Sequence, residues 1–257
     1  MEIHFMKKVF ITGVSSGIGK ELALEYAKKN YLIGLIARRN DLLNEVAEEC
    51  NNLGSKTFLY QLDVQDRKQC EKVVKQFLND AGGIDYVIAN AGIGGDDNIF
   101  SGSSKSINNI LKTNIHGVTN ILMPFIPLMK SQNHGYLVCV SSVASYMPLP
   151  FHGGYSSSKI AIRRIFDSWR PSLQKHNINL ITICPGFIDT PMVKGPARKF
   201  PLKKANEAAK IFINAIENKK HNFVYPRYYY LLIWLFTLTP LIFYNWFIKK
   251  MFSKPFN

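Results

Sequence analysis

The chain has 257 residues, of which 47% are hydrophobic and 19% are charged. That length suits one large domain, and the composition excludes intrinsic disorder, collagen and coiled coil. Lys and Arg number 32 against 18 Asp and Glu, and this net charge of +14 predicts anionic partners such as cofactor phosphates or a membrane surface. No nucleic acid motif accompanies the charge, so nucleic acid is not expected as a partner.

The cysteines Cys50, Cys70, Cys139 and Cys184 are widely spaced and form no C-x-x-C pair. We therefore expect neither a disulfide framework nor a metal site, and we place Cys139 and Cys184 in the core as reduced thiols. The first residues carry no apolar signal segment or cleavage site, which favours a cytoplasmic location.

Short apolar runs alternate along the chain with segments of helical spacing. The expected strands are Lys7–Thr12, Tyr31–Ala37, Thr57–Leu62, Ile84–Ala89, Tyr136–Ser141, Ile178–Cys184 and a short Asn222–Tyr225. The expected helices are Ile18–Lys29, Asp41–Asn52, Asp66–Asn79, Ser104–Lys130, Tyr155–His176 and Lys203–Asn218. Near-continuous apolar strands separated by helices predict a single-domain α/β fold with a doubly wound parallel sheet.

A glycine-rich turn follows the first strand and opens the first helix, with the spacing T-G-x-x-x-G-x-G. Glycine allows a tight turn and a close approach of the backbone to a pyrophosphate, and the helix N-terminus offers unbonded N–H groups. The candidate phosphate-binding residues are Thr12, Gly13, Ser15, Ser16, Gly17, Ile18 and Gly19.

Tyr155 and Lys159 stand one turn apart on the same face of an expected helix. A nearby ammonium favours the phenolate, so we expect the pKa of Tyr155 to be lowered toward neutrality, which suits acid–base work on a carbonyl or an alcohol. Ser142 follows the strand that precedes this helix and is placed to hold the substrate oxygen. Ser141 is its competitor, although strand alternation points it to the opposite face.

Further motifs follow in a fixed order. They are Asn90-Ala91-Gly92, Asn114, Ser142, Tyr155-Ser156-Ser157-Ser158-Lys159 and Pro185-Gly186. Together with the glycine turn they resemble the short-chain dehydrogenase/reductase family over about residues 6–225. The resemblance implies a Rossmann-like sheet and an NAD(P)H-dependent oxidoreductase that transfers a hydride.

The resemblance also implies a role for each matching residue. Tyr155 would protonate the substrate oxygen, Lys159 would bind the nicotinamide ribose, and Ser142 would hold the substrate. Asn114 would help to hold the lysine and a water relay. The remaining cofactor-binding residues that it implies are Asp63, Val64, Asn90, Ala91, Gly92, Pro185, Gly186, Ile188 and Thr190.

The end of the second expected strand decides the cofactor. An acidic residue there would bind the adenosine ribose hydroxyls and repel a 2′-phosphate. This chain instead has Arg38 and Arg39, whose guanidinium groups suit a phosphate. NADP(H) is therefore the expected cofactor, with NAD(H) as the second choice, and the alternative is a pair of solvated surface arginines.

The expected substrate surface is apolar. It comprises Met147, Leu149, Phe151, Phe187 and Met192. The favoured function is the NADPH-dependent reduction of a lipophilic ketone to a secondary alcohol. The alternatives are an alcohol or hydroxysteroid-type dehydrogenase working oxidatively, and a membrane-bound NADP(H)-binding regulator without turnover.

We expect residues 1–226 to form the cofactor-binding domain and residues 227–257 to form a hydrophobic tail. The tail contains the uncharged run Tyr228–Ile248, which Thr239-Pro240 divides into two pieces. A bent anchor at a membrane surface is favoured. A spanning helix and burial at a subunit interface remain open, and the family resemblance implies a homodimer or homotetramer.

Overall fold

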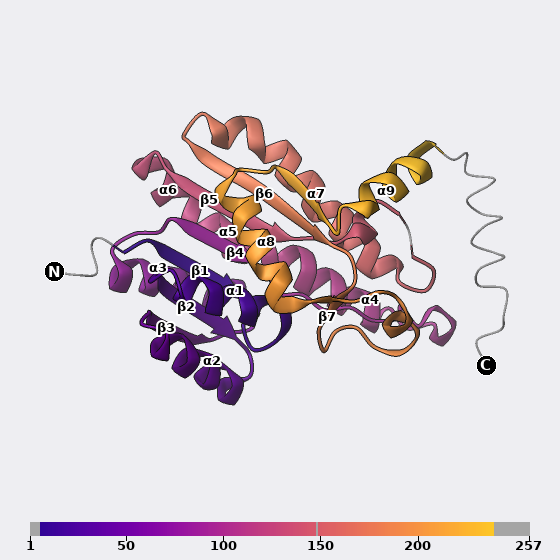
Figure 1. The fold of residues 1–257 in the computed structure, drawn as a ribbon, viewed down its shortest axis with the longest axis horizontal. Helices are drawn as coiled ribbons and strands as arrows, with labels where there is room; N and C mark the ends of the chain where they lie inside the picture. Colours follow the sequence, from indigo (N-terminus) through magenta and orange to yellow (C-terminus); the bar gives the residue numbers. More distant parts are fainter. Residues whose placement is uncertain (1–5, 148, 239–257) are drawn as a thin grey trace.

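The computed structural model describes residues 6–147 and 149–238, drawn in colour in Figure 1. A seven-stranded parallel sheet crosses the molecule in the order β3-β2-β1-β4-β5-β6-β9. Its strands are β1 (Lys8–Thr12), β2 (Leu32–Ala37), β3 (Lys56–Gln61), β4 (Tyr86–Ala89), β5 (Gly135–Val140), β6 (Ile178–Pro185) and β9 (Asn222–Tyr225). The order reverses between β1 and β4, so the predicted doubly wound α/β fold is confirmed.

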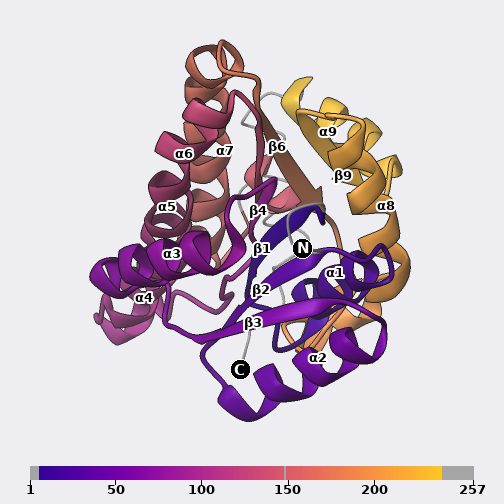
Figure 2. The ribbon, with the colours of Figure 1, turned by 90° about the vertical axis from the view of Figure 1, so that its left-hand side faces the viewer.

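Helices cover both faces of the sheet (Figure 2). One face carries α1 (Gly17–Ala27), α2 (Asn40–Asn52) and α8 (Ala205–Glu217). The other carries α3 (Arg67–Ala81), α4 (Lys105–Leu111), α5 (Gly117–Leu122), α6 (Ile126–Gln132) and α7 (Gly153–Gln174). Every residue of β1 and β2 is buried, as expected for strands enclosed on both sides.

The core is divided by the sheet into two layers. Phe10 of β1 points into the layer beneath α3 and α5, where its ring centroid lies 5.1 Å from that of Phe77 and 5.0 Å from that of Phe125. Ile11, the next residue, points to the opposite layer and packs in the same cluster as Phe212 of α8. The alternation of the strand therefore ties both helical layers to one central element.

The helical segment expected at Ser104–Lys130 is helical from Lys105 to Gln132, but it is not one regular α-helix. After α4 come a π-helical turn (Lys112–His116), α5, a 3₁₀ turn (Met123–Phe125) and α6. Pro124 and Pro127 lie at the start of the last two pieces and cannot donate a backbone hydrogen bond, which breaks the regular ladder. The π-turn contains Asn114, and such local widening is frequent at functional sites.

Short elements not expected from the sequence lie between the main ones. β7 (Ile188–Asp189) pairs in parallel with β8 (Lys203–Lys204) as a separate small sheet. Three-residue 3₁₀ turns occur at Ile99–Ser101 and Val143–Ser145, and a five-residue one at Gly195–Lys199. Strands of two residues and turns of three to five residues are too short to show a hydrophobic periodicity in the sequence. They form because tertiary contacts hold them.

A last described helix, α9 (Tyr228–Leu238), packs beside the edge strand β9. Tyr229 and Ile233 are buried against Cys184 and Val224. The Tyr230 hydroxyl accepts the Val224 N–H at 3.1 Å and donates to the Asn222 carbonyl at 3.2 Å. These contacts dock the start of the expected tail on the domain.

Among the residues that the structure describes, no helix has both the length and the apolar character needed to cross a membrane. The rest of the predicted tail, including Thr239-Pro240, lies outside the described residues.

Candidate active site

The residues singled out from the sequence gather at one edge of the sheet, where the parallel strands end. Thr12 ends β1, and Ala37 ends β2 just before the two arginines. Asn90 follows β4, Ser142 follows β5, and Gly186 follows β6. This carboxyl-end edge, at the reversal of strand order, is where doubly wound sheets bind ligands.

The glycine turn has the backbone that its sequence predicts. Gly13 and Gly17 have φ angles of 73° and 61°, which side chains other than glycine rarely adopt. A Cβ on Gly19 would overlap the Gly13 carbonyl oxygen and the Asn90 amide, so the first turn of α1 lies tightly on the loop. The N–H groups at the start of α1 are thereby presented at the sheet edge.

Thr12 and Asn90 lock this loop to the next strand end. The Thr12 hydroxyl oxygen accepts the N–H groups of Asn90 and Ala91 at 3.1 and 3.0 Å. The Asn90 amide in turn donates to the carbonyls of Thr12 and Gly13 at 3.0 and 3.2 Å. The two side chains therefore act here as braces, and they fix the shape of the loop.

Arg39 reaches back to the glycine loop. Its Nη2 lies 2.7 Å from the Ser15 hydroxyl and 3.1 Å from the Ser16 hydroxyl. Arg38 points instead to Asp63, with 3.5 Å between its Nη1 and the carboxylate. Both arginines are exposed, so a cationic surface adjoins the loop hydroxyls.

Asp63 and Val64 follow β3 on the same edge. The Asp63 carboxylate accepts the Gln65 N–H at 3.0 Å as well as facing Arg38. Val64 is buried, its carbonyl accepts the Asn120 amide at 2.9 Å, and its side chain packs on Gly117 of α5.

Tyr155 and Ser142 are brought together as predicted. Ser142 is close enough to the Tyr155 hydroxyl to lower its pKa. The Ser142 hydroxyl donates to the Pro185 carbonyl at 3.4 Å, and its Oγ accepts the Ala144 N–H at 3.1 Å. Ser141 points away, and its hydroxyl donates to the Lys159 carbonyl at 2.9 Å inside the protein. The structure thus favours Ser142 over its competitor.

Lys159 lies beneath the tyrosine ring. Its Nζ is 5.7 Å from the ring centroid of Tyr155 and donates to the Val140 carbonyl at 2.8 Å. Lys159 is only 6% exposed, and burial lowers the pKa of its ammonium to about 8.

The expectation of a lowered tyrosine pKa is wrong for this structure. Burial raises the pKa of Tyr155 above its ordinary value, hydrogen bonding to Ser142 lowers it, and the Cys184 thiol raises it. Desolvation of the phenolate is the largest of these effects, and the Lys159 ammonium, 5.7 Å from the ring centroid, does not reverse it. Tyr155 is therefore held protonated at neutral pH.

Asn114 braces the loop after β4. Its Oδ1 accepts the Ile93 N–H and its Nδ2 donates to the Ile93 carbonyl, both at 2.9 Å, and Nδ2 also lies 3.0 Å from the Ser158 hydroxyl. Among the described residues Asn114 forms no hydrogen bond with Lys159, but both side chains border Gly92, where a Cβ would lie 3.2 Å from Asn114 and 3.3 Å from Lys159.

The segment after β6 closes the other side of the site. The Gly186 N–H donates to the Tyr225 carbonyl at 2.7 Å, and the Tyr229 ring of α9 fills the space where a Cβ on Gly186 would stand. Ile188 is buried in β7. The Thr190 side chain faces the glycine turn, because a Cβ on Gly17 would lie 3.0 Å from its methyl group.

Part of the expected apolar surface lies beside Tyr155. A Cβ on Gly94 would contact both Met192, at 3.8 Å, and the Tyr155 ring, at 3.9 Å. Met192 is 51% exposed, and Phe187 stacks on Phe200 with ring centroids 4.6 Å apart.

Sequence reasoning missed Asp97. It is buried, and its carboxylate oxygens accept the Gly154 N–H at 2.9 and 3.1 Å. The only signal in the sequence is an acidic residue in the loop after the Asn90-Ala91-Gly92 motif, and that signal does not reveal a partner 57 residues away.

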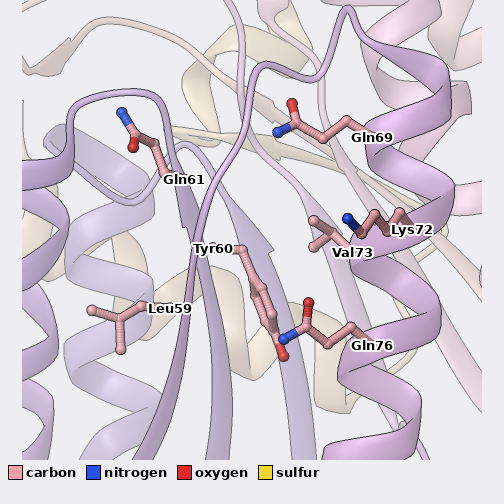
Figure 3. Close-up of a pocket in the computed structure, with 7 residues that line it drawn as sticks. All are labelled: Leu59, Tyr60, Gln61, Gln69, Lys72, Val73 and Gln76. Atoms are coloured by element: carbon pink, nitrogen blue, oxygen red, sulfur yellow. The ribbon is translucent and has the colours of Figure 1, made fainter.

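A separate pocket of about 310 Å³ lies between β3 and α3 (Figure 3). It is lined by Leu59, Tyr60 and Gln61 of β3 and by Gln69, Lys72, Val73 and Gln76 of α3, and the Tyr60 ring is directed toward Gln76. None of the site residues predicted from the sequence lines this pocket.

The residues at the sheet edge fit a nicotinamide dinucleotide. The glycine turn and the start of α1 offer N–H groups for a pyrophosphate, and the glycines at positions 13 and 17, which have positive φ angles, carry no Cβ that would keep a phosphate away. Gly92 leaves room above Asn114 and Lys159 that a Cβ would fill.

Comparison with known proteins agrees with this geometry. The short chain dehydrogenase family model matches residues 7–199. The chain is 33% identical over 205 residues to the 3-oxoacyl-[acyl-carrier-protein] reductase FabG of Thermotoga maritima, covering 79% of this chain and 80% of that protein. It is 31% identical over 225 residues to human 17-beta-hydroxysteroid dehydrogenase 13, covering 86% and 75%.

A solved structure supports the same assignment. The alcohol dehydrogenase of the archaeon Thermococcus sibiricus, complexed with 5-hydroxy-NADP, superposes with a TM-score of 0.77 and 27% identity. The match covers 85% of this chain and 95% of that one. The chain therefore belongs to the short-chain dehydrogenase/reductase family of NAD(P)-dependent oxidoreductases.

Proposed function

We propose that the protein is an NADPH-dependent reductase that converts a lipophilic ketone to a secondary alcohol. The observation that carries the proposal is the group formed by Tyr155, Ser142 and Lys159 at the carboxyl ends of β5 and β6. A reduced nicotinamide, when bound, supplies the hydride. Because Tyr155 keeps its proton at neutral pH, it is in the right state to donate that proton to the substrate oxygen.

The other residues of the group assist this proton transfer. The Ser142 hydroxyl, which lies near enough to Tyr155 to lower its pKa, would hold the substrate oxygen beside it. The Lys159 ammonium, 5.7 Å from the ring, would stabilise the phenolate left after transfer and bind the ribose. Asn114 would keep the loop after β4 in place through its two bonds to Ile93.

Arg39 supports the choice of NADPH. Its guanidinium and the hydroxyls of Ser15 and Ser16 form a compact set of donors beside the glycine turn. Such a set suits the 2′-phosphate of NADPH, and no carboxylate of the described chain occupies the end of β2. Arg38 lies next to this set of donors and faces the Asp63 carboxylate. When a phosphate binds, Arg38 would leave Asp63 and pair with the phosphate.

The exposed Met192 and the stacked Phe187 and Phe200 support a lipophilic substrate. The relatives named 3-oxoacyl-[acyl-carrier-protein] reductase and hydroxysteroid dehydrogenase agree with a chain-bearing or ring-bearing ketone. The exposed apolar side chains of α9, among them Leu231 and Leu238, support contact of the tail with a membrane surface.

The test is a ketone panel with NADPH, run with detergent and with lipid vesicles. The panel contains a decalone, an acetoacetyl thioester and a small sugar ketone. We expect the first two to be reduced and Tyr155→Phe to abolish turnover while leaving NADPH binding nearly intact. Wild-type rates in Tyr155→Phe, or activity confined to the sugar ketone, would overturn the proposal.

A further inference from the structure

The N-terminus of α7 is held by a carboxylate from a distant loop. The Asp97 oxygens accept the N–H of Gly154, the second residue of α7, at 2.9 and 3.1 Å. His152, in the capping position, makes no such side-chain bond. Since the first N–H groups of a helix lack partners and carry partial positive charge, the Asp97 carboxylate replaces the missing local cap.

Two more hydrogen bonds join the same segments. The Asp97 N–H donates to the Phe151 carbonyl at 2.8 Å, and the His152 Nδ1 lies 2.7 Å from the Gly95 carbonyl oxygen. Phe151 has a φ of 61°, in the left-handed region that a bulky residue rarely adopts. The bonds from residues 95–97 therefore hold the turn before α7 in a conformation that it would not keep alone.

The contact between Asp97 and Gly154 is tightly packed. A Cβ on Gly154 would lie 2.7 Å from the Ile107 side chain and 2.9 Å from the Asp97 carboxylate. Asp97 is 7% exposed, and within the described part of the chain no cationic side chain forms an ion pair with it. Its buried charge therefore faces the helix N-terminus.

We infer that Asp97 is a positioning residue for the reaction, because it fixes the first turn of α7 and thereby the Tyr155 hydroxyl against Ser142. Tyr155 directly follows Gly154, so any movement of this turn changes the distance between the two hydroxyl groups. The inference rests on the proposed role of Tyr155. Asp97 itself touches neither hydroxyl; it acts through the helix.

The experiment compares Asp97→Ala, which removes the acceptor, with Asp97→Asn, which keeps one acceptor oxygen. The exposed neighbour supplies a matched control, Asp96→Asn. We expect Asp97→Ala to lower kcat for the most rapidly reduced panel ketone about 10- to 100-fold, with Kd for NADPH and KM changed less than about threefold. Asp97→Asn should keep kcat within about threefold of wild type.

Two readouts separate positioning from general folding. Hydrogen exchange of the cofactor-free protein should rise about tenfold at residues 152–158 in Asp97→Ala only. Hydrogen bonding to Ser142 lowers the pKa of Tyr155, so its loss should move the Tyr155-dependent limb of the oxidative pH profile upward in Asp97→Ala. The facing titratable groups, Lys159 and Cys184, are unchanged in all variants.

Different results would contradict the role of Asp97 and the proposed function. Wild-type kcat and exchange in Asp97→Ala, or an equal loss in Asp97→Asn, would overturn the role of Asp97, and so would a parallel loss of NADPH binding. If Asp97→Ala does not fold, Asp97→Ser takes its place with the same criteria. Wild-type kcat in Tyr155→Phe, measured alongside, would overturn the proposed function instead.

Discussion

Replacing Arg39 by alanine tests the source of cofactor preference. The Arg39 guanidinium lies 2.7 Å from the Ser15 hydroxyl, so a 2′-phosphate bound there would share donors with both side chains. A hydrogen bond to a charged group contributes about 1.5–3 kcal/mol, and each 1.4 kcal/mol is about tenfold in affinity. Because Arg39 is exposed and screened by solvent, the lower part of that range applies.

We therefore expect Arg39→Ala to lower kcat/KM for NADPH roughly 10- to 30-fold and to leave kcat/KM for NADH within about twofold. Arg38→Ala should have a smaller effect, about three- to tenfold, because Arg38 already faces the Asp63 carboxylate at 3.5 Å. Raising the salt concentration should weaken NADPH binding in the wild type and reduce the difference in kcat/KM for NADPH between the wild type and Arg39→Ala.

The assay is initial-rate kinetics with both cofactors on one ketone. Arg67→Ala is the control, since Arg67 is an exposed arginine of α3 that pairs with Glu71. An equal loss with NADPH and NADH in Arg39→Ala, or a wild-type preference for NADH, would refute the reasoning about the phosphate.

Three further outcomes are expected. The pKa of Lys159 is about 8 in the folded chain and higher in the unfolded chain, so the folded state loses this proton at a lower pH. The free energy of unfolding, measured by chemical denaturation, should therefore rise between about pH 8 and about pH 10. Over the same range the affinity for NADPH, measured by fluorescence titration, should fall. No fall in affinity above about pH 8 would argue against a charged Lys159 in binding. Gly19→Ala should cost about 1–3 kcal/mol and several degrees in Tm, because its Cβ overlaps the Gly13 carbonyl; an unchanged Tm in calorimetry would contradict the tight loop. Tyr230→Phe should lower the free energy of unfolding by about 1–3 kcal/mol, because it leaves the Val224 N–H and Asn222 carbonyl without their partner; an unchanged urea midpoint would show that water replaces the hydroxyl.

Hydrophobic runs predicted the main sheet from the sequence, because buried parallel strands such as Leu32–Ala37 are apolar throughout. The helical layers followed from the segments between them. The division of the segment after β4 was missed, because helical spacing continues through Lys112–His116 although the hydrogen-bond pattern changes there. The small β7–β8 pair was missed because two residues carry no period.

The site could be predicted where residues adjoin in sequence. The glycine turn and the Tyr155/Lys159 pair are local, and the structure brings both to the same edge of the sheet with Ser142. The pKa of Tyr155 could not be predicted, since it depends on burial by residues from several elements. Asp97 could not be assigned either, because its partner lies 57 residues away.

At the edge strand β9, the Tyr230 hydroxyl forms backbone hydrogen bonds that a neighbouring strand would otherwise form. Its single oxygen engages both the donor at Val224 and the acceptor at Asn222, so this stretch of backbone is not available to a strand of a second molecule. Pairing of β9 with a strand of a second molecule would first require α9 to move away from β9. Any force that draws this helix off the domain would therefore also open a surface capable of self-association.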